Sequence, residues 1–511
     1  MNQAIASFDE KQGIRSLIKL YREYGQYDFS SFTSLASLVG INSSNQMTIG
    51  DFSKIASALQ AKPFLILTGL SGSGKTLQAL KFAKWITPQN QLPDTFYPGA
   101  KIPSSQVTYF VNKSDSVGVE LWNSPDSENA VKVVLAREMI SEWVEYIETH
   151  GIPKTTSARK IRNAVKGPSK FSDQLHSFET HLKAAAFTVI EQSKNTNFGK
   201  NYELISVGAD WTSNENLLGY PDALKGMGYR KPDNGALDLI LRAKVNPDLP
   251  YFLILDEMNL SHVERYFSDF LSAMESGEAI SLHDGDEEII WDKVPGKLTI
   301  PKNLFVIGTV NVDETTYMFS PKVLDRANVI EFRVSEDEMG KFLKNPVKPD
   351  LDAISGQGVE YARGFVAAAK LRDIPLDDTT REDVSKVLMK FFPALKEARA
   401  EFGYRTAHEI CRFVYFYKDL SDAKEWSLDK AMDAAIMQKL LPKLHGSKKK
   451  LGPVLAALIR LCLKEEARPE NDPIKDELLV ESNALYPNSL KKLSRMRKCL
   501  VEHGFTSFAE A

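Results

Sequence analysis

Eight consecutive residues have the types and spacing of a phosphate-binding loop. The stretch GLSGSGKT, Gly69 to Thr76, matches the pattern G-x-x-x-x-G-K-[ST]. Its glycines let backbone N–H groups turn toward a phosphate, and a following helix adds the partial positive charge of its N-terminus. We expect Lys75 to reach the β- and γ-phosphates and the Thr76 hydroxyl to bind Mg²⁺. Nucleotide contacts are expected from nine residues in a row: Gly69, Leu70, Ser71, Gly72, Ser73, Gly74, Lys75, Thr76 and Leu77.

A second stretch, FLILDEMN, places two carboxylates directly after four apolar residues. An apolar run of this kind is typical of a buried strand, so Asp256 is expected at the strand's carboxyl end, beside the phosphate loop. Asp256 would then belong to the Mg²⁺ shell, and Glu257 would polarise the attacking water as a base. The alternative is a surface acidic pair that follows an unrelated strand.

A third stretch, LFVIGTVNVD, ends a further strand in Asn311. An amide at this position can orient water near the γ-phosphate, so we interpret Asn311 as a sensor of the nucleotide. Without the two preceding motifs, the same asparagine would be interpreted as a turn residue.

Two arginines are candidates for the developing phosphate charge. Arg326, in VLDRA, could act on a neighbouring subunit's nucleotide as an arginine finger; the alternative is an ion pair with Asp325 or Glu331. Arg405, in EFGYRTAHEICRF, could reach the nucleotide from a helical lid; the alternative is a solvated helix charge. Arg412 is a weaker candidate for the same role.

The elements that must position these residues alternate between strand and helix. Strands are expected at 64–68, 202–207, 251–255, 304–309 and 329–332, with amphipathic helices between them. This alternation predicts an α/β fold with a parallel sheet. From about residue 336 onward the pattern is helical.

The expected organisation has four parts. Residues 1–43 form an N-terminal helical segment, 44–335 the α/β core, 336–465 a helical lid, and 466–511 a C-terminal helical region. A helical insertion of about residues 88–199 interrupts the core after the helix that follows the phosphate loop. Its predicted helices contain Val131, Leu135, Met139 and Trp143, then Phe178, Leu182, Ala185 and Val189. The basic segment between them, Lys154 to Lys170, is either a solvated linker or a contact for a nucleic-acid backbone.

Composition excludes several other classes. The 511 residues are 43% hydrophobic and 26% charged, with a formal net charge of −3, so global charge gives no sign of nucleic-acid binding. Three dispersed cysteines indicate neither a disulfide framework nor a metal site, which favours a reducing, cytoplasmic compartment. We find no run of about 18 apolar residues, so no membrane span is expected. No nuclease or esterase motif is visible either.

Taken together, these residues resemble AAA+ proteins, and within them the motor subunit of McrBC-type restriction systems; the MoxR and dynein-related ATPases are broader relatives. The resemblance covers residues 44–87, 200–335 and much of 400–511. Beyond the phosphate loop it rests on five blocks: VGADWTSNENLLGY, LILDEMNLSHVERYFSDFLSAMES, IGTVNVDETTYMFSPKVLDRA, LLPKLHGSKKKL and HGFTSF.

The resemblance implies a P-loop AAA+ core that assembles as a hexameric ring with nucleotide between subunits. It implies Walker B roles for Asp256 and Glu257, a first sensor at Asn311, a finger at Arg326 and a second sensor at Arg405. It also implies a separately encoded, McrC-like nuclease partner. DNA would then be contacted through that partner or through the basic insertion.

Two features differ from the best-known McrB-like member, which uses GTP, has an N-T-A-D block after its sensor strand, and carries an N-terminal DNA-reading domain. Here the block is NVDE, residues 311–314, so ATP is expected and GTP is the alternative. Only 43 residues precede the core, which are too few for such a domain. The sequence therefore predicts a ring motor of a restriction or anti-phage defence system. The alternatives are a MoxR-like remodelling chaperone and a nucleotide-binding switch without turnover.

Overall fold

The computed structural model describes residues 49–87 and most of 200–511. Four strand segments are described between them, at 101–103, 108–114, 118–122 and 132–136. Short gaps fall at 225, 227, 287–288, 293, 313–318, 345, 347–349, 422–425 and 470–475. The predicted N-terminal helical segment and the basic segment of the insertion lie outside the described residues.

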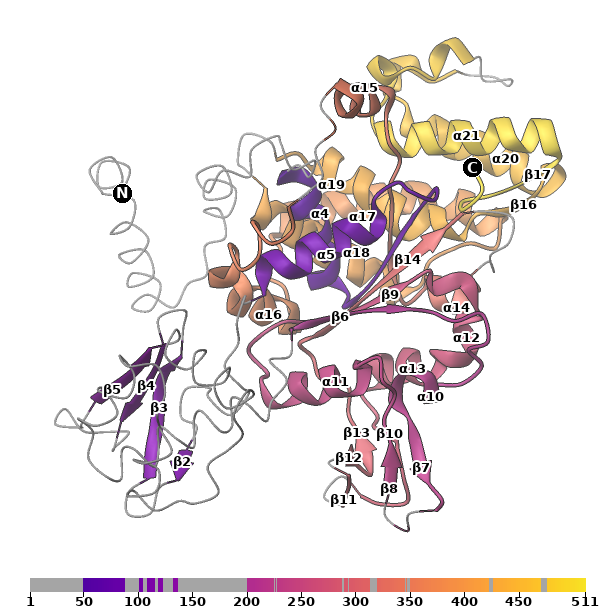
Figure 1. Cartoon of the computed structure of the whole chain (residues 1–511). Helices are drawn as coiled ribbons and strands as arrows, with labels where there is room; N and C mark the ends of the chain where they lie inside the picture. The colour runs from indigo at the N-terminus through magenta and orange to yellow at the C-terminus, as the bar shows by residue number, and fades with distance from the viewer. Residues whose placement is uncertain are drawn as a thin grey trace, which may run out of the picture.

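A five-stranded parallel sheet forms the centre of the molecule (Figure 1), in the order β15-β1-β14-β9-β6. Its strands are β1 (Phe64–Gly69), β6 (Tyr202–Ser206), β9 (Tyr251–Asp256), β14 (Leu304–Asn311) and β15 (Asn328–Glu331). Each strand expected from the sequence is present within one or two residues of its predicted bounds. The α/β class and the parallel sheet are therefore confirmed.

Helices cover both faces of this sheet because its strands are apolar on both sides; all six residues of β1 are buried. On one face, Phe82 of α5 (Lys75–Ile86) packs at 5.7 Å from Phe252, which stacks on Phe305 at 5.5 Å. On the other face, Phe267 packs at 5.6 Å from Phe64. The remaining helices of the core are α4 (Ile49–Ala61), α10 (Glu215–Leu218), α11 (Ala236–Val245), α12 (Val263–Tyr266), α13 (Ser268–Ser276) and α14 (Pro321–Leu324).

Small antiparallel pairs project from the core below the sheet in Figure 1, and the sequence analysis did not predict them. They are β7 (Tyr220–Asp222) with β8 (Gly228–Arg230), β10 (Ile280–Ser281) with β13 (Lys297–Leu298), and β11 (Ile290–Trp291) with β12 (Val294–Pro295). An aromatic cluster joins them: His283 stacks on Trp291 at 4.2 Å and meets the edge of Tyr229 at 6.1 Å.

The insertion contains strands where helix was expected. Strands β2 (Lys101–Pro103), β3 (Thr108–Ser114), β4 (Gly118–Trp122) and β5 (Lys132–Ala136) form an antiparallel sheet. The helical interpretation is therefore wrong at Leu135, which lies within β5, whereas Val131, Met139 and Trp143 lie outside the described residues. KVVLA is a short apolar run that is compatible with the periodicity of a helix or of a strand, and its two β-branched valines favour a strand. The predicted helix around Phe178 lies outside the described residues.

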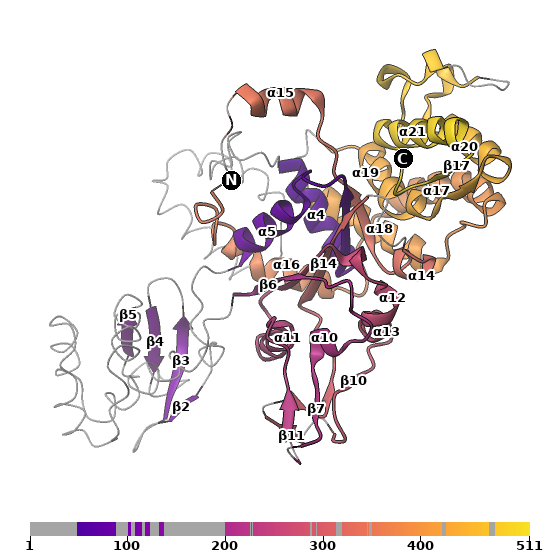
Figure 2. The same cartoon turned by 45° about the vertical axis from the view of Figure 1, so that its right-hand side comes forward.

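The region after β15 is helical, as expected. Its helices are α15 (Glu336–Lys344), α16 (Ala362–Lys370), α17 (Asp378–Glu397), α18 (Tyr404–Leu420), α19 (Leu428–Ala435), a π-helical turn η4 (Ile436–Leu440), α20 (Lys448–Cys462) and α21 (Pro487–His503). Figure 2 shows α20 beside α21, and strand β16 (His445–Ser447) pairs antiparallel with β17 (Phe505–Ser507). The C-terminal helix is therefore tied to the preceding helices. Within the parts of the chain that the structure describes, every helix is too short or too polar to span a membrane.

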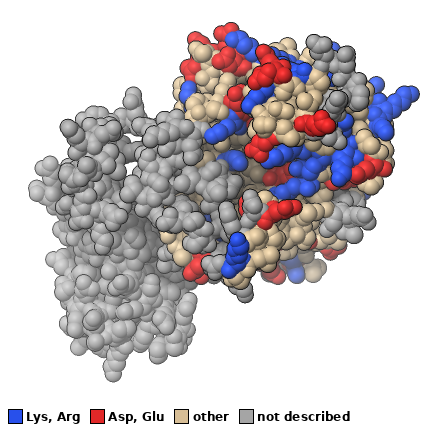
Figure 3. Space-filling model, turned by 90° about the horizontal axis from the view of Figure 1, so that it is seen from above, with Lys and Arg blue, Asp and Glu red and all other residues tan. Residues whose placement is uncertain are grey.

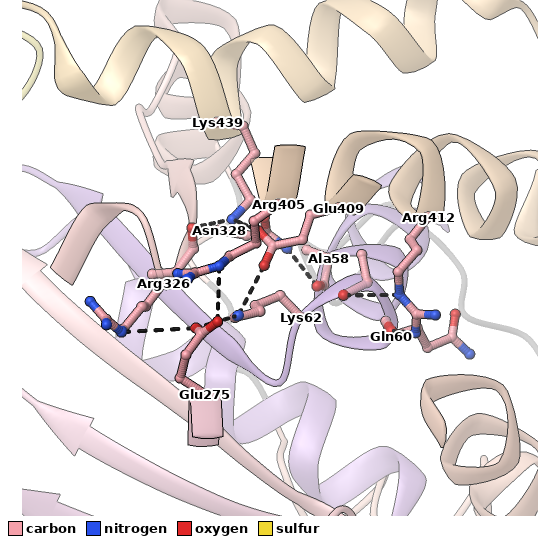
Figure 4. Close-up of polar contacts among 12 residues, drawn as sticks. Ala58, Gln60, Lys62, Glu275, Arg326, Asn328, Arg405, Glu409, Arg412 and Lys439 are labelled. Carbon is pink, nitrogen blue, oxygen red and sulfur yellow. Dashed lines mark hydrogen bonds and ion pairs between the residues drawn. The ribbon is translucent and has the colours of Figure 1, made fainter. Parts of the chain in front are cut away.

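Arg412 of α18 fastens this helical region to the core (Figure 4). Its buried guanidinium donates to the carbonyls of Gln60 at 2.9 Å and Ala61 at 3.2 Å, at the end of α4. It also donates to Ala369 at 3.2 Å, at the end of α16, and to Leu371. Because helix C-termini leave carbonyls unpaired, one cation at two such ends satisfies both. These four hydrogen bonds give Arg412 a structural role, and its weaker candidacy as a nucleotide sensor stays a prediction.

Candidate functional site

The predicted site residues gather at one edge of the sheet, where the parallel strands end. Gly69, the last residue of β1, is paired with Asn311, the last residue of β14. Asp256 ends β9 between β14 and β6, and its carbonyl accepts from Val207 N at 3.0 Å. Ligands of open α/β sheets bind outside the carboxyl ends of the strands. The phosphate loop, the carboxylate pair and the sensor asparagine therefore occupy the edge where a ligand would sit.

Two glycines give the phosphate loop its shape. A Cβ on Gly69 would lie 2.2 Å from the carbonyl oxygen of Phe332, so any side chain there would collide with the backbone after β15. Gly74 has φ 89° and caps α5, a conformation that L-residues with a Cβ rarely adopt. The strand, loop and helix follow one another as the sequence predicted, and the helix begins at Lys75, directly after this glycine.

The Lys75 ammonium lies inside the loop and is 4% exposed. It donates to the carbonyl oxygens of Gly69 at 3.0 Å and Leu70 at 2.8 Å, and to Ser73 Oγ at 3.4 Å. The loop thus encloses a positive charge beside backbone oxygens, a setting in which an anion would be stabilised. The nucleotide contacts expected from Gly69 to Leu77 stay a prediction.

Asp256 is the centre of a hydrogen-bond chain. Its Oδ1 accepts from Thr76 Oγ1 at 2.6 Å and from Thr309 Oγ1 at 2.6 Å. The first contact joins the phosphate-loop helix to β9, and the second joins β9 to β14. Two hydroxyl donors fix the carboxylate beside the start of α5, where the sequence analysis expected it.

Glu257 is held in an unusual backbone conformation. With φ 52° and ψ 46° it is one of three non-glycine residues with positive φ among those described, which costs on the order of 1–3 kcal/mol. Thr309 Oγ1 accepts from Glu257 N at 3.0 Å, and Asn311 Nδ2 donates to Glu257 Oε1 at 2.8 Å. Asn259 Nδ2, in turn, donates to the carbonyl of Asn311 at 3.0 Å. Such strain persists only where neighbours enforce it, and here Thr309 and Asn311 hold the residue and its exposed carboxylate in place.

Thr309 and Asn259 take part in the site although the sequence analysis did not select them. Thr309 is 2% exposed, and its hydroxyl contacts both Asp256 and Glu257. The signal was the strand period: residues two apart share a face, so Thr309 lies on the same side of β14 as Asn311. Asn259 is also 2% exposed and follows the carboxylate pair by two residues. A buried amide so close to a strand end was a second available signal.

The oxygen atoms at this edge fit a magnesium ion. Mg²⁺ prefers hard oxygen ligands at about 2.0–2.1 Å in octahedral geometry, which places neighbouring ligands roughly 2.9 Å apart. Thr76 Oγ1 and Asp256 Oδ1, 2.6 Å apart, are within a few tenths of an ångström of that spacing. The described residues contain no cluster of three or more His, Cys, Asp or Glu side chains able to hold a metal, so the ligands at this edge would be one carboxylate and one hydroxyl.

Arg326 and Arg405 lie at the opposite edge of the sheet. Both face Glu275, at the end of α13: Arg405 Nε is 2.9 Å from Oε1, and Arg326 Nε is 3.9 Å from Oε2 (Figure 4). Lys62, which precedes β1, contacts the same carboxylate at 3.4 Å. A strand rises about 3.3 Å per residue, so Lys62 and Gly69 are separated by roughly 20 Å.

Arg405 therefore does not reach its own chain's phosphate loop in this structure. The role of Arg405 as a second sensor stays a prediction; in this structure α18 begins at the edge of the sheet opposite the loop. Arg326 is equally remote from its own loop, as a residue acting on a neighbouring subunit must be. Its partner is Glu275, and neither of the two alternatives considered, Asp325 and Glu331, pairs with it among the described residues.

A buried carboxylate extends this cluster into the helical region. Glu409 of α18 is 5% exposed and pairs with Lys62 at 2.9 Å and with Lys439 of η4. Burial alone would raise the pKa of the Glu409 carboxyl, but the two lysines outweigh burial and hold that pKa below its ordinary 4.5. Lys439 also donates to the carbonyl of Ala327 at 2.9 Å, next to Arg326.

Comparison with known proteins gives a match to the helical region. A family model described as a domain of unknown function (DUF8727) matches residues 358–505, which span α16 to α21. The match contains Arg405, Glu409 and Arg412 but not the phosphate loop or the carboxylate pair. No curated protein matches this chain.

Proposed function

We propose that this chain is an Mg²⁺-dependent nucleoside triphosphatase of the AAA+ type. One observation carries the proposal: an unbroken chain of hydrogen bonds links Thr76, Asp256, Thr309, Glu257 and Asn311 at the carboxyl edge of the sheet. It joins a phosphate loop, an acidic metal ligand and a candidate base. These are the parts that attack of water on a γ-phosphate requires.

The chemistry divides among residues that are already fixed. Thr76 and Asp256 would hold Mg²⁺, which would neutralise charge on the phosphates when bound. Lys75 supplies a buried positive charge inside the loop. Glu257 would accept the proton of the attacking water, and Asn311 holds its carboxylate in place. Because the groups are oriented before substrate arrives, positioning and charge account for most of the rate.

We place this activity in an oligomeric ring, as the motor subunit of an McrBC-like restriction or anti-phage system in the cytoplasm. Arg326 lies away from its own loop, as a finger that acts on a neighbouring copy would, and the proposed assembly is a hexamer. ATP is the proposed substrate and GTP the alternative. The resemblance to McrB-like proteins implies a separate McrC-like nuclease subunit as the partner.

Contact with DNA is assigned to that partner or to the insertion. On the face seen in Figure 3, Lys and Arg side chains are interspersed with Asp and Glu. On α21, Lys491 pairs with Glu481 at 3.0 Å and Arg495 with Glu331 at 2.6 Å. Cations with acidic partners are a poor match for a nucleic-acid backbone.

Phosphate release from MgATP and MgGTP, with and without the product of the neighbouring gene, tests the proposal. The wild-type chain should hydrolyse one of them, and Lys75→Ala should lose binding or turnover. Lys84→Ala is the matched control, because Lys84 lies on the same helix and pairs with Asp352 instead. Equal rates for Lys75→Ala and Lys84→Ala would contradict the proposal. Stimulation by a nuclease-domain partner would support the restriction system, and its absence with every nuclease neighbour tested would favour a remodelling chaperone.

A further inference from the structure

One carboxylate holds two arginines that come from different parts of the chain. Glu275 lies at the end of α13, Arg326 precedes β15 of the core, and Arg405 begins α18 of the helical region. The three side chains converge in Figure 4, and they are 26%, 21% and 45% exposed, so the cluster opens to solvent on the Arg405 side.

Both guanidinium groups have donors to spare. A guanidinium has five N–H donors. Arg326 donates from Nη1 to the carbonyl of Lys322 at 3.0 Å, whereas its buried Nε has no hydrogen-bond partner. Among the described residues, Arg405 is paired with Glu275 alone. The buried Arg326 Nε without an acceptor is costly, and an incoming anion would supply acceptors both to it and to the free, partly exposed donors of Arg405.

The charges of the cluster do not balance. Two carboxylates, Glu275 and Glu409, face four cationic side chains: Lys62, Arg326, Arg405 and Lys439. Two positive charges are therefore in excess within a half-buried cluster. A phosphate carries the opposite charge and accepts from planar, forked donors, so it matches a pair of arginines better than a neutral group does.

The phosphate cannot belong to the nucleotide of the same chain, because the cluster and the loop lie at opposite edges of the sheet. We propose that Glu275 is a positioning residue that holds Arg326 and Arg405 together as one site for the phosphates of a nucleotide bound to a neighbouring copy of this chain. The inference rests on the proposed function. The inference adds Glu275 to that function as a positioning residue, and it assigns Arg405 to the nucleotide of the neighbouring copy instead of to the nucleotide of its own chain.

Lys439 supports the same geometry from the backbone. Its ammonium is buried and anchors the carbonyl of Ala327, the residue after Arg326. Its partner Glu409 lies one turn after Arg405 on α18. The Glu409–Lys439 ion pair therefore fixes the backbone beside both arginines, and Glu275 fixes the orientation of their side chains.

The first test is steady-state hydrolysis by Glu275→Gln, which removes the charge and keeps the shape. We expect kcat to fall about tenfold or more, as for a misplaced catalytic group, with KM changed less than about twofold. Glu278→Gln is the matched control, because Glu278 is an exposed glutamate three residues on that forms no ion pair with the other described residues. Arg405→Ala, at a residue 45% exposed, should lower kcat to a similar extent without unfolding the chain.

The second test mixes subunits. Glu257→Gln lacks the base but keeps its arginine site, whereas Glu275→Gln keeps the base and has a defective arginine site. In mixed assemblies, some interfaces combine the intact base of a Glu275→Gln subunit with the intact arginine site of a Glu257→Gln subunit. The hydrolysis rate of the mixture should therefore exceed the average of the rates of the two variants alone. A mixture of Glu275→Gln with Arg326→Ala, which are defective at the same site, should give no such gain.

Three results would overturn the inference. The first two are an unchanged kcat for Glu275→Gln and an unchanged kcat for Arg405→Ala. The third is a hydrolysis rate of the Glu257→Gln and Glu275→Gln mixture that equals the average of the two variants, when mass photometry shows that mixed assemblies have formed. Each would leave wild-type hydrolysis intact. Absence of hydrolysis by the wild-type chain would instead reject the proposed function, and with it this inference.

Discussion

The hydroxyl of Thr309 gives the sharpest prediction because one oxygen atom contacts both Asp256 and Glu257 of the candidate site. Thr309→Val keeps the shape of the side chain and removes the hydroxyl. The donor to Asp256 Oδ1 at 2.6 Å is lost, and the backbone N–H of Glu257 loses its acceptor at 3.0 Å. A buried N–H without a partner costs about 1–3 kcal/mol. That amount is comparable to the strain stored at Glu257, so we expect the Glu257 backbone to relax.

The consequence for turnover follows from this relaxation. A base displaced by about 1 Å lowers the rate about a hundredfold, which corresponds to about 2.7 kcal/mol of transition-state stabilisation. Thr309→Ser is the control, since it keeps both hydrogen bonds and loses one methyl group. Phosphate release at saturating nucleotide gives kcat, and the urea midpoint gives stability. If Thr309→Val and Thr309→Ser both turned over at the wild-type rate, the assignment of Thr309 would be refuted.

Three further predictions concern charge and metal. Glu409→Gln should destabilise the chain by about 3–5 kcal/mol at pH 7, since Lys439 is left unpaired. Because the folded pKa of Glu409 is below 4.5, the stabilisation from its charge is present above pH 4.5 and lost as the pH falls below that value. The melting temperature should therefore fall less steeply on acidification in the variant than in the wild type, and equal slopes would argue against the ion pair. Arg412→Lys should lower the melting temperature by a few degrees at unchanged kcat, because an ammonium cannot serve carbonyls on two helix ends; a selective loss of kcat would support Arg412 as a sensor. EDTA should abolish hydrolysis, and a full rate in EDTA would exclude the Mg²⁺ role of Thr76 and Asp256.

The sheet and most of the site could be predicted because local signals specify them. Apolar runs bounded by Pro or Gly marked the strands, and the positions of Gly69, Asp256 and Asn311 at strand ends followed from those runs. Parallel strands then bring their ends to one edge, so residues far apart in sequence could be expected to meet.

The remainder depended on tertiary packing. The edge at which α18 begins is set by contacts such as those of Arg412, and no local pattern reports them, so the ion pair of Arg405 with Glu275 was not predicted. The short apolar run around Leu135 was compatible with both helical and strand periodicity, and it forms strand β5. Thr309 was overlooked because a threonine inside a strand is ordinary until its partners are known.

Substitution of Glu257 by Gln tests the central assignment most directly. The variant keeps the size of the side chain and can still accept from Asn311, but it cannot take a proton. Nucleotide affinity, measured by calorimetry with MgATP, should stay within about threefold of wild type, while kcat falls by about a hundredfold or more. Wild-type turnover by Glu257→Gln would show that the proton goes elsewhere and would contradict the hydrolytic role of this edge.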